Sequence, residues 1–181
     1  MANWTKVSDN LLQNGEHLYR SCLPNSRHYD REGDVFEQWK ERGIQVVFSL
    51  LPWEEAFGRR LRDLKEDLHH EQLLSIHHPV SDFGAWELND FQEMVTQLDN
   101  VLANQQRVVV HCHAGVGRTG TLIAGLFIAR GENLEDAIER IEQYGMSVES
   151  HGQRGLLERF VRYRCKDSFQ ENLNQDECER I

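Results

Sequence analysis

The chain has 181 residues, a length that suits one domain with its own hydrophobic core. Acidic residues number 30 against 20 basic ones, and the formal net charge of −10 argues against a general nucleic-acid-binding protein, which normally carries a basic face. Hydrophobic residues at 39% and charged residues at 28% are typical of a folded protein and exclude a disordered chain.

The chain carries no recognisable targeting or membrane segment. The first residues, MANWTKVSDN, lack the basic and then apolar pattern of a signal peptide, and no apolar run approaches the roughly 18 residues of a membrane span. Four cysteines are too few for a disulfide framework in a chain of this length. We therefore expect a cytoplasmic protein with free thiols, with one domain over residues 1–165 and a polar, frayed tail over 166–181.

Four β-rich runs lie between helical patterns along the chain. They cover residues 17–20, 45–51, 74–77 and 107–112, and two of them contain continuous apolar runs, Val-Val-Phe at 46–48 and Val-Val-Val at 108–110. Continuous apolar runs such as Val-Val-Val are typical of strands that are covered on both faces. Strands that alternate with helices predict an α/β domain with a central, mostly parallel sheet of about four to five strands flanked by helices.

Several helices are predicted from apolar side chains that repeat with a period of 3.6 residues. One segment, Thr121–Ala129, is apolar nearly all round, which predicts a buried central helix. Asn133 is a suitable N-cap for a helix over residues 134–144, and Gly145 suits the position after its end. The remaining apolar repeats run from Phe57 to Leu68, from Leu88 to Leu102 and from Leu156 to Val161.

The segment His111–Gly120, HCHAGVGRTG, joins the last predicted strand to the buried helix. A strand, a glycine-containing loop and a helix N-terminus form a binding place for phosphate, because backbone N–H groups point inward and the helix dipole favours negative charge. The field of such a loop favours the thiolate form of Cys112, which is the nucleophilic form. Arg118, six positions later, can bind two phosphate oxygens at once. These residues predict attack of sulfur on phosphorus.

The loop resembles the signature of the cysteine-dependent protein phosphatases, and the chain is similar in size to their dual-specificity branch. The resemblance covers about residues 18–164. It implies that Cys112 forms a phosphocysteine intermediate, that Arg118 stabilises the transition state, that Thr119 hydrogen-bonds the sulfur and that His111 orients the loop. It also implies that phosphate is bound by the residues that follow the nucleophile: His113, Ala114, Gly115, Val116, Gly117 and Arg118.

Expulsion of an alkoxide or phenoxide needs a proton donor, and Asp82 is the candidate. It lies in HHPVSDFGAW, and its spacing from His77 and Pro79 is similar to a pattern of the kinase-associated phosphatases. The resemblance implies that Asp82 is the acid in the first step and the base for water in the second. Asp90 is the alternative acid, and a purely turn-forming role is the alternative for Asp82.

A second segment, Ser147–Gln153, resembles a Ser-Ile-Glu-Thr-x-x-Gln segment of the same family. It makes Gln153 a supporting residue that positions the hydrolytic water, and a surface position at a helix start is the alternative. Glu149 is interpreted as stabilising the fold. Trp86 either lines the substrate entrance or anchors the core.

We therefore predict a phosphomonoester hydrolase without a cofactor or metal, acting as a monomer on phosphotyrosine, and also phosphoserine or phosphothreonine, in proteins. It is not expected to bind nucleic acid or a membrane. The absence of lysine beside Cys112 favours a phosphoprotein over a phosphoinositide or other non-protein phosphate, which stays the first alternative. Further alternatives are an arsenate reductase-like enzyme, an inactive phosphate-binding module, and a zinc site built from His77, His78, His111, Cys112 and His113.

Overall fold

The computed structural model describes residues 6–178, and their side chains as far as residue 164. Its sheet has four parallel strands in the order β1-β4-β2-β3. The α/β class and the parallel sheet are therefore confirmed. The strands are β1 (His17–Ser21), β2 (Val46–Ser49), β3 (Leu74–His77) and β4 (Arg107–His111).

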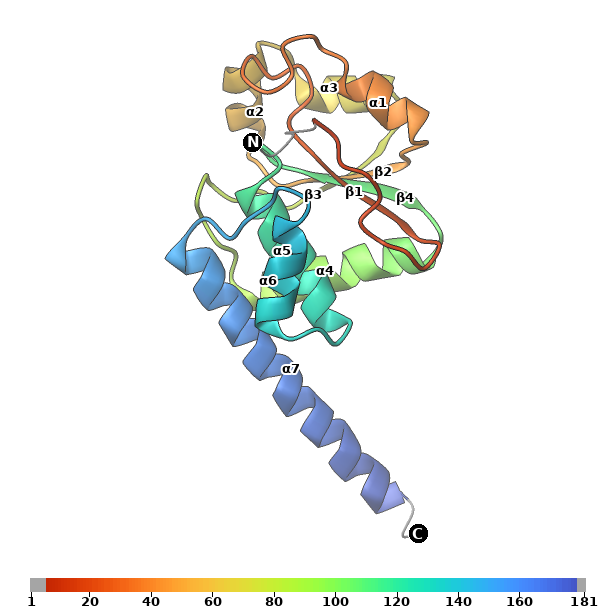
Figure 1. Ribbon diagram of the computed structural model, residues 1–181, viewed down its shortest axis with the longest axis vertical. Coiled ribbons are helices and arrows are strands. Elements are labelled where there is room, and N and C mark those ends of the chain that lie inside the picture. Colours follow the sequence, from red (N-terminus) through yellow and green to blue (C-terminus); the bar gives the residue numbers. More distant parts are fainter. Residues whose placement is uncertain (1–5, 179–181) are drawn as a thin grey trace.

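Helices cover both faces of the sheet. One face carries α1 (Val35–Glu41), α2 (Trp53–Arg60) and α3 (Leu64–His70), and the other carries α4 (Leu88–Ala103), α5 (Gly117–Ala129), α6 (Leu134–Glu142) and α7 (His151–Cys178) (Figure 1). Successive strand residues point to opposite faces and so enter two separate cores. Phe48 and Val110 lie in the core under α4 and α5, whereas Val47 and Val109 lie in the core under α1 and α3.

Three of the predicted helices are confirmed in position. The apolar stripe of α4 is buried, and α5 is buried along nearly its whole length, although it begins at Gly117, four residues before the predicted segment. Asn133 caps α6 by accepting a hydrogen bond from the backbone N–H of Asp136 at 3.0 Å. Gly145 follows α6 with a φ of +73°, a backbone conformation that glycine adopts without strain.

The prediction of one helix through Phe57 and Leu68 is wrong. The chain forms two helices there, because Leu61 has a φ of 61° and ends α2 in the left-handed region. Asp63 then caps α3 by accepting from the backbone N–H of Lys65 at 2.8 Å. The repeat of apolar residues continues across this break, but it does not mark one buried helix face, since Phe57 and Leu61 are exposed.

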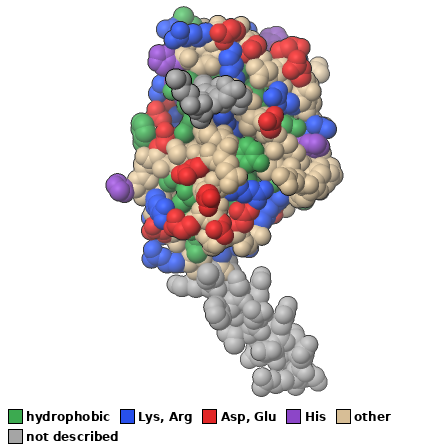
Figure 2. Space-filling view, in the orientation of Figure 1, with side chains coloured by type: hydrophobic (Ala, Val, Ile, Leu, Met, Phe, Trp, Pro, Cys, Tyr) green, Lys and Arg blue, Asp and Glu red, His purple; other side chains and the backbone are tan. Residues whose placement is uncertain are grey.

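The C-terminal segment also differs from the prediction. We expected a frayed tail from residue 166, whereas α7 continues as a helix to Cys178 and projects beyond the body of the molecule (Figure 1). Within residues 6–178 no helix is long and apolar enough to cross a membrane. Acidic and basic side chains are intermixed on the face shown in Figure 2.

Candidate active site

The loop that follows β4 lies at the carboxyl edge of the parallel sheet, where α/β proteins commonly bind ligands. The backbone N–H of Leu23 donates to the carbonyl oxygen of His113 at 2.9 Å, which fastens the loop to the segment after β1. Gly115 has a φ of +75°, and a Cβ there would overlap the carbonyl group of Ser21. Glycine is therefore required at this turn of the loop.

Cys112, the candidate nucleophile, lies at the start of the loop, directly after β4. Cys112 is 3% exposed and is a free thiol, as is Cys22. The ring of His111 is completely buried, and this burial lowers its pKa to about 4. The ring is therefore neutral at physiological pH, and its Nδ1 lies 3.1 Å from the carbonyl oxygen of Cys112. This contact is suited to orienting the loop backbone.

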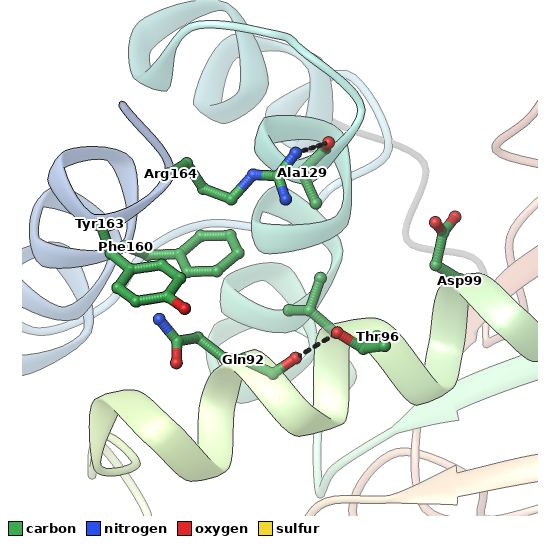
Figure 3. A pocket seen from close by; sticks show the side chains of 8 residues that line it. Gln92, Thr96, Asp99, Ala129, Phe160, Tyr163 and Arg164 are labelled. Atoms are coloured by element: carbon green, nitrogen blue, oxygen red, sulfur yellow. Dashed lines mark hydrogen bonds between the residues drawn. The ribbon is translucent and has the colours of Figure 1, made fainter. Parts of the chain in front are cut away.

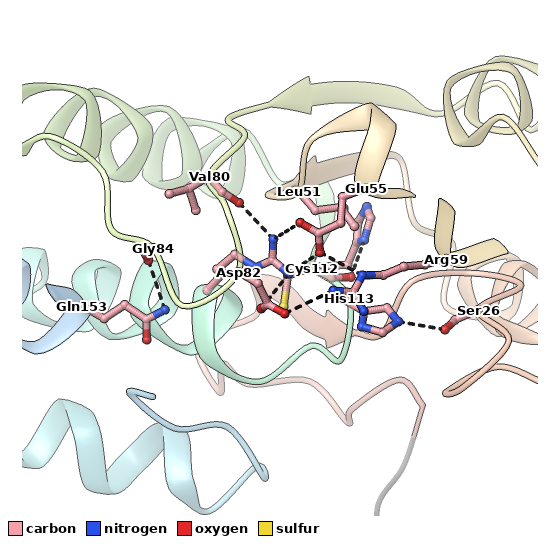
Figure 4. A network of polar contacts seen from close by, with 12 residues as sticks. Ser26, Leu51, Glu55, Arg59, Val80, Asp82, Gly84, Cys112, His113 and Gln153 are labelled. Carbon is pink, nitrogen blue, oxygen red and sulfur yellow. Dashed lines mark hydrogen bonds and ion pairs between the residues drawn. The ribbon is translucent and has the colours of Figure 1, made fainter. Parts of the chain in front are cut away.

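The guanidinium group of Arg118 is 2% exposed and lies among acceptors. Glu55 binds it with both carboxylate oxygens, at 3.1 and 2.9 Å, while the carbonyl oxygen of Val80 accepts at 3.0 Å and Asp82 accepts at 3.2 Å. Burial opposes the charge of Arg118, but Glu55, Cys112 and Asp82 together raise its pKa. Figure 4 shows Glu55, Asp82 and Cys112 close to one another.

Sequence analysis did not identify Glu55 as a site residue. It stands in the first turn of α2, 63 positions before Arg118, and nothing local in the sequence marks a contact over that distance. Burial opposes ionisation of Glu55, but the hydrogen bonds and charge of Arg118 outweigh it and lower the pKa of the carboxyl group. Glu55 is therefore an ionised partner of Arg118.

The structure brings Asp82 to the loop and leaves Asp90 on a helix. Asp82 is half-exposed and bridges Arg118 at 3.2 Å and Arg59 at 3.3 Å. Asp90 is exposed in the first turn of α4. Of the two carboxylates considered as the acid, Asp82 is the one in direct contact with Arg118.

Two further candidate residues, Thr119 and Gln153, are fully buried. The hydroxyl group of Thr119 is buried and has no hydrogen-bond partner among the described residues. Gln153 is also fully buried, which contradicts the surface alternative for it. Its Nε2 donates to the carbonyl oxygen of Gly84 at 3.2 Å, and its Oε1 accepts from the backbone N–H of Glu149 at 2.9 Å. Gln153 thus joins the Asp82 loop to the segment before α7.

Trp86 belongs to the core and not to the substrate entrance. It is 8% exposed, and its Nε1 donates to the carbonyl oxygen of His78 at 3.1 Å. The histidines of the alternative zinc site also contact other groups, since His77 binds the carbonyl oxygen of Leu51 and His78 binds Gln97. Among the described residues no group of three or more side chains is arranged to hold a metal ion.

A small cavity of about 200 Å³ adjoins the loop at His113. The ring of His113 contacts Ser26, with Nε2 and Oγ 3.3 Å apart, and packs against the ring of Tyr29. Burial and the charge of Arg59 lower the pKa of His113 to about 4, so this ring is also neutral. The other residues that line the cavity are Arg27, His28, Gly58 and Arg59.

Another cavity, of about 350 Å³, lies away from the loop between α4, α5 and α7 (Figure 3). Arg164 donates to the carbonyl oxygen of Ala129 at its edge. No cysteine, serine or histidine lines it, so it offers none of the nucleophiles present at the loop. Its lining residues are Gln92, Val95, Thr96, Asp99, Ala129, Phe160, Tyr163 and Arg164.

The fold and the loop together define a cysteine-dependent phosphatase of the dual-specificity type, as the sequence resemblance implied. The chain belongs to a family described as "Polymorphic toxin system, DSP-PTPase phosphatase", whose sequence model matches residues 25–132.

The chain is also similar in sequence to named proteins. The chain is 26% identical over 129 residues to cyclin-dependent kinase inhibitor 3 from Sus scrofa, covering 70% of this chain and 60% of that protein. It is 24% identical over 176 residues to the Homo sapiens protein of the same name, covering 94% of this chain and 79% of that protein.

Solved structures support the fold. A kinase-associated phosphatase structure, in which the catalytic-site cysteine is replaced by serine, aligns with a TM-score of 0.75 at 20% identity, covering 92% of this chain and 97% of that one. The structure of Tk-PTP in its active form aligns with a TM-score of 0.70 at 20% identity, covering 90% and 99%.

Proposed function

We propose that the chain hydrolyses phosphomonoesters in two steps through a phosphocysteine intermediate at Cys112. In the first step the thiolate attacks phosphorus and the alcohol leaves, and in the second step water attacks the intermediate and releases phosphate. The single observation that carries this proposal is the placement of Cys112 and Arg118, 3% and 2% exposed, at the two ends of one loop that opens α5. Thr119, with its buried hydroxyl, is the group proposed to hydrogen-bond the departing sulfur.

Arg118 is proposed to hold the phosphate together with the backbone of residues 113–118. Its guanidinium group forms ion pairs with Glu55 and Asp82. A bound phosphate would share the guanidinium group with Glu55 and take the place of Asp82. This leaves the arginine preoriented for two parallel hydrogen bonds to the phosphate oxygens.

Asp82 is proposed as the proton donor to the leaving oxygen and then as the base for water. Its position beside Arg118 is what supports this role, because the arginine marks where the phosphate binds. His111 and Gln153 are proposed to support the site by contacts with the loop backbone and the Asp82 loop.

The substrate is proposed to be phosphotyrosine, and also phosphoserine or phosphothreonine, in proteins. The names of the kinase-inhibitor relatives and of a Bos taurus protein, "Protein tyrosine phosphatase domain-containing protein 1", support a protein substrate. A phosphoinositide is the alternative, supported by a fold likeness to PTPMT1, solved in complex with PI(5)P, at a TM-score of 0.72. We also propose that the chain acts as a monomer in the cytoplasm, where Cys112 stays reduced. It is proposed to need no cofactor and to bind neither a membrane nor nucleic acid.

An assay with a panel of phosphorylated compounds tests the proposed substrate class. Phosphate release is measured under reducing conditions with a chelator present, using phosphotyrosine, phosphoserine and phosphothreonine peptides and water-soluble phosphoinositides. Faster release from the peptides supports the proposal. Faster release from the phosphoinositides would assign the alternative, and no release from any of them would contradict the enzyme.

A further inference from the structure

The carboxylate of Glu149 lies on the phosphate-binding loop itself. A Cβ built on Gly117 would overlap this carboxylate, so the absence of a side chain at Gly117 is what admits it. Glu149 comes from the segment between α6 and α7, and its outer side remains open to solvent. The sequence interpretation of Glu149 as a fold-stabilising residue does not account for a carboxylate placed against an anion-binding backbone.

Gln153 holds this segment beside the Asp82 loop. Its side-chain amide binds the backbone of Glu149 at one end and the backbone of Gly84, two residues after Asp82, at the other. Because Gln153 is fully buried, both hydrogen bonds are shielded from water. The arrangement keeps Glu149 and Asp82 over the same loop.

The two carboxylates differ in their surroundings. Asp82 is ion-paired with both Arg118 and Arg59, at 3.2 and 3.3 Å. Burial and the negative charge of Asp82 raise the pKa of Glu149, against the opposing effects of Arg118 and of the backbone N–H of Gly117. A proton is therefore held more readily at Glu149 than a carboxyl group in water would hold it.

We propose that Glu149 stores the proton that Asp82 delivers to the leaving group. Phosphate binding breaks the ion pair between Arg118 and Asp82, and Asp82 then accepts the proton from Glu149. As the bond from Cys112 sulfur to phosphorus forms and the bond from phosphorus to the leaving oxygen breaks, this proton passes from Asp82 to that oxygen. In the second step a water proton returns to the carboxylate pair as the sulfur–phosphorus bond breaks.

This role rests on the proposed function and predicts a dependence on the leaving group. A phenyl or alkyl phosphate needs a proton on its departing oxygen, whereas a nitrophenyl phosphate departs with little help. Glu149→Gln is therefore expected to lower kcat for phenyl phosphate by roughly 10–100-fold while leaving kcat for nitrophenyl phosphate within about twofold. The basic limb of the phenyl phosphate profile should move to lower pH, because the proton store is lost.

The second half of the experiment uses Asp82→Asn, alone and combined with Glu149→Gln in a double variant. If the two carboxylates act as one unit, the double variant is no slower than Asp82→Asn alone. Glu142→Gln, an exposed change on α6, is the matched control and should behave as the wild type. Glu149→Asp guards against a folding defect, since it keeps a carboxyl group and should restore part of the rate.

The outcomes separate the two proposals. Equal loss with both substrates, no loss with either, or effects that multiply in the double variant would overturn the role of Glu149 while leaving a Cys112-dependent enzyme intact. Wild-type protein without turnover, or Cys112→Ser protein with full turnover, would overturn the proposed function and this role with it.

Discussion

Arg118 is the residue on which the site depends, because it is the only arginine in the loop and is almost completely buried. Two carboxylates and one carbonyl group hold its guanidinium group in place. A buried arginine needs such partners, since an unpaired buried charge is strongly destabilising. Glu55 and Asp82 therefore hold in position the group that we propose binds phosphate.

The role of Asp82 is tested by a single substitution. Asp82→Ala should lower kcat for phenyl phosphate by roughly 10²–10⁴-fold and flatten the basic limb of its pH profile, because the leaving oxygen loses its proton donor. Steady-state kinetics across the pH range measure both effects. Asp90→Ala is the control and should retain wild-type kinetics. Loss of rate in Asp90→Ala together with an unchanged Asp82→Ala would move the acid to α4.

At the scale of secondary-structure elements, two segments outside the loop shape the approach to Cys112. The segment after β1 carries Arg27 and is held to the loop through Ser26 and His113. Helix α2 carries Arg59, whose carbonyl oxygen accepts from the backbone N–H of Arg27 at 3.3 Å. These contacts place two arginines at one cavity beside the loop that carries Cys112, although the whole chain has a net charge of −10.

This local charge predicts a preference for acidic residues next to the phosphorylated residue. Arg27→Ala should raise KM for a phosphopeptide with acidic neighbours up to about fivefold, as expected for one exposed charge pair, and leave kinetics on a small aryl phosphate unchanged. Arg31→Ala, an exposed change in the same segment outside the cavity, is the matched control. An equal change in KM for peptides with acidic and with neutral neighbours would contradict the preference.

The elements that were predicted correctly from the sequence are those that form through interactions between residues close together in the chain. The stripe of α4 and the cap at Asn133 each lie within a few residues, so periodicity and capping were sufficient. The break at Leu61 was missed because its left-handed backbone is not marked by a glycine. Glu55 was missed as a site residue, and the placement of Glu149 against Gly117 was not foreseen, because each depends on contacts between distant segments.

At the scale of the whole molecule, the two histidines that flank Cys112 couple folding to pH. Burial lowers the pKa of His111 and of His113 to about 4, whereas the ordinary histidine value is 6.5. The unfolded chain therefore takes up protons on these rings as the pH falls through about 6.5, and the folded protein does not. Folding stability is fully present above about 6.5 and is lost progressively as the pH falls toward 4.

Urea unfolding across this pH interval checks that coupling. The free energy of unfolding should fall steadily between about pH 6.5 and pH 4, and His111→Asn should show a smaller fall than the wild type. His151→Gln, at an exposed position, is the control and should retain the wild-type dependence. A free energy of unfolding that stays constant over the interval would show that these rings are not held neutral by the fold.

Rapid acid quenching during turnover of an aryl phosphate, followed by mass spectrometry of the peptide that contains Cys112, tests the two-step reaction most directly. We expect one added phosphoryl group on Cys112 in the wild type, more of it when the second step is slowed, and none in Cys112→Ser, which should also lack turnover. Turnover by Cys112→Ser, or a phosphoryl group on another residue, would contradict the assignment of Cys112 as the nucleophile.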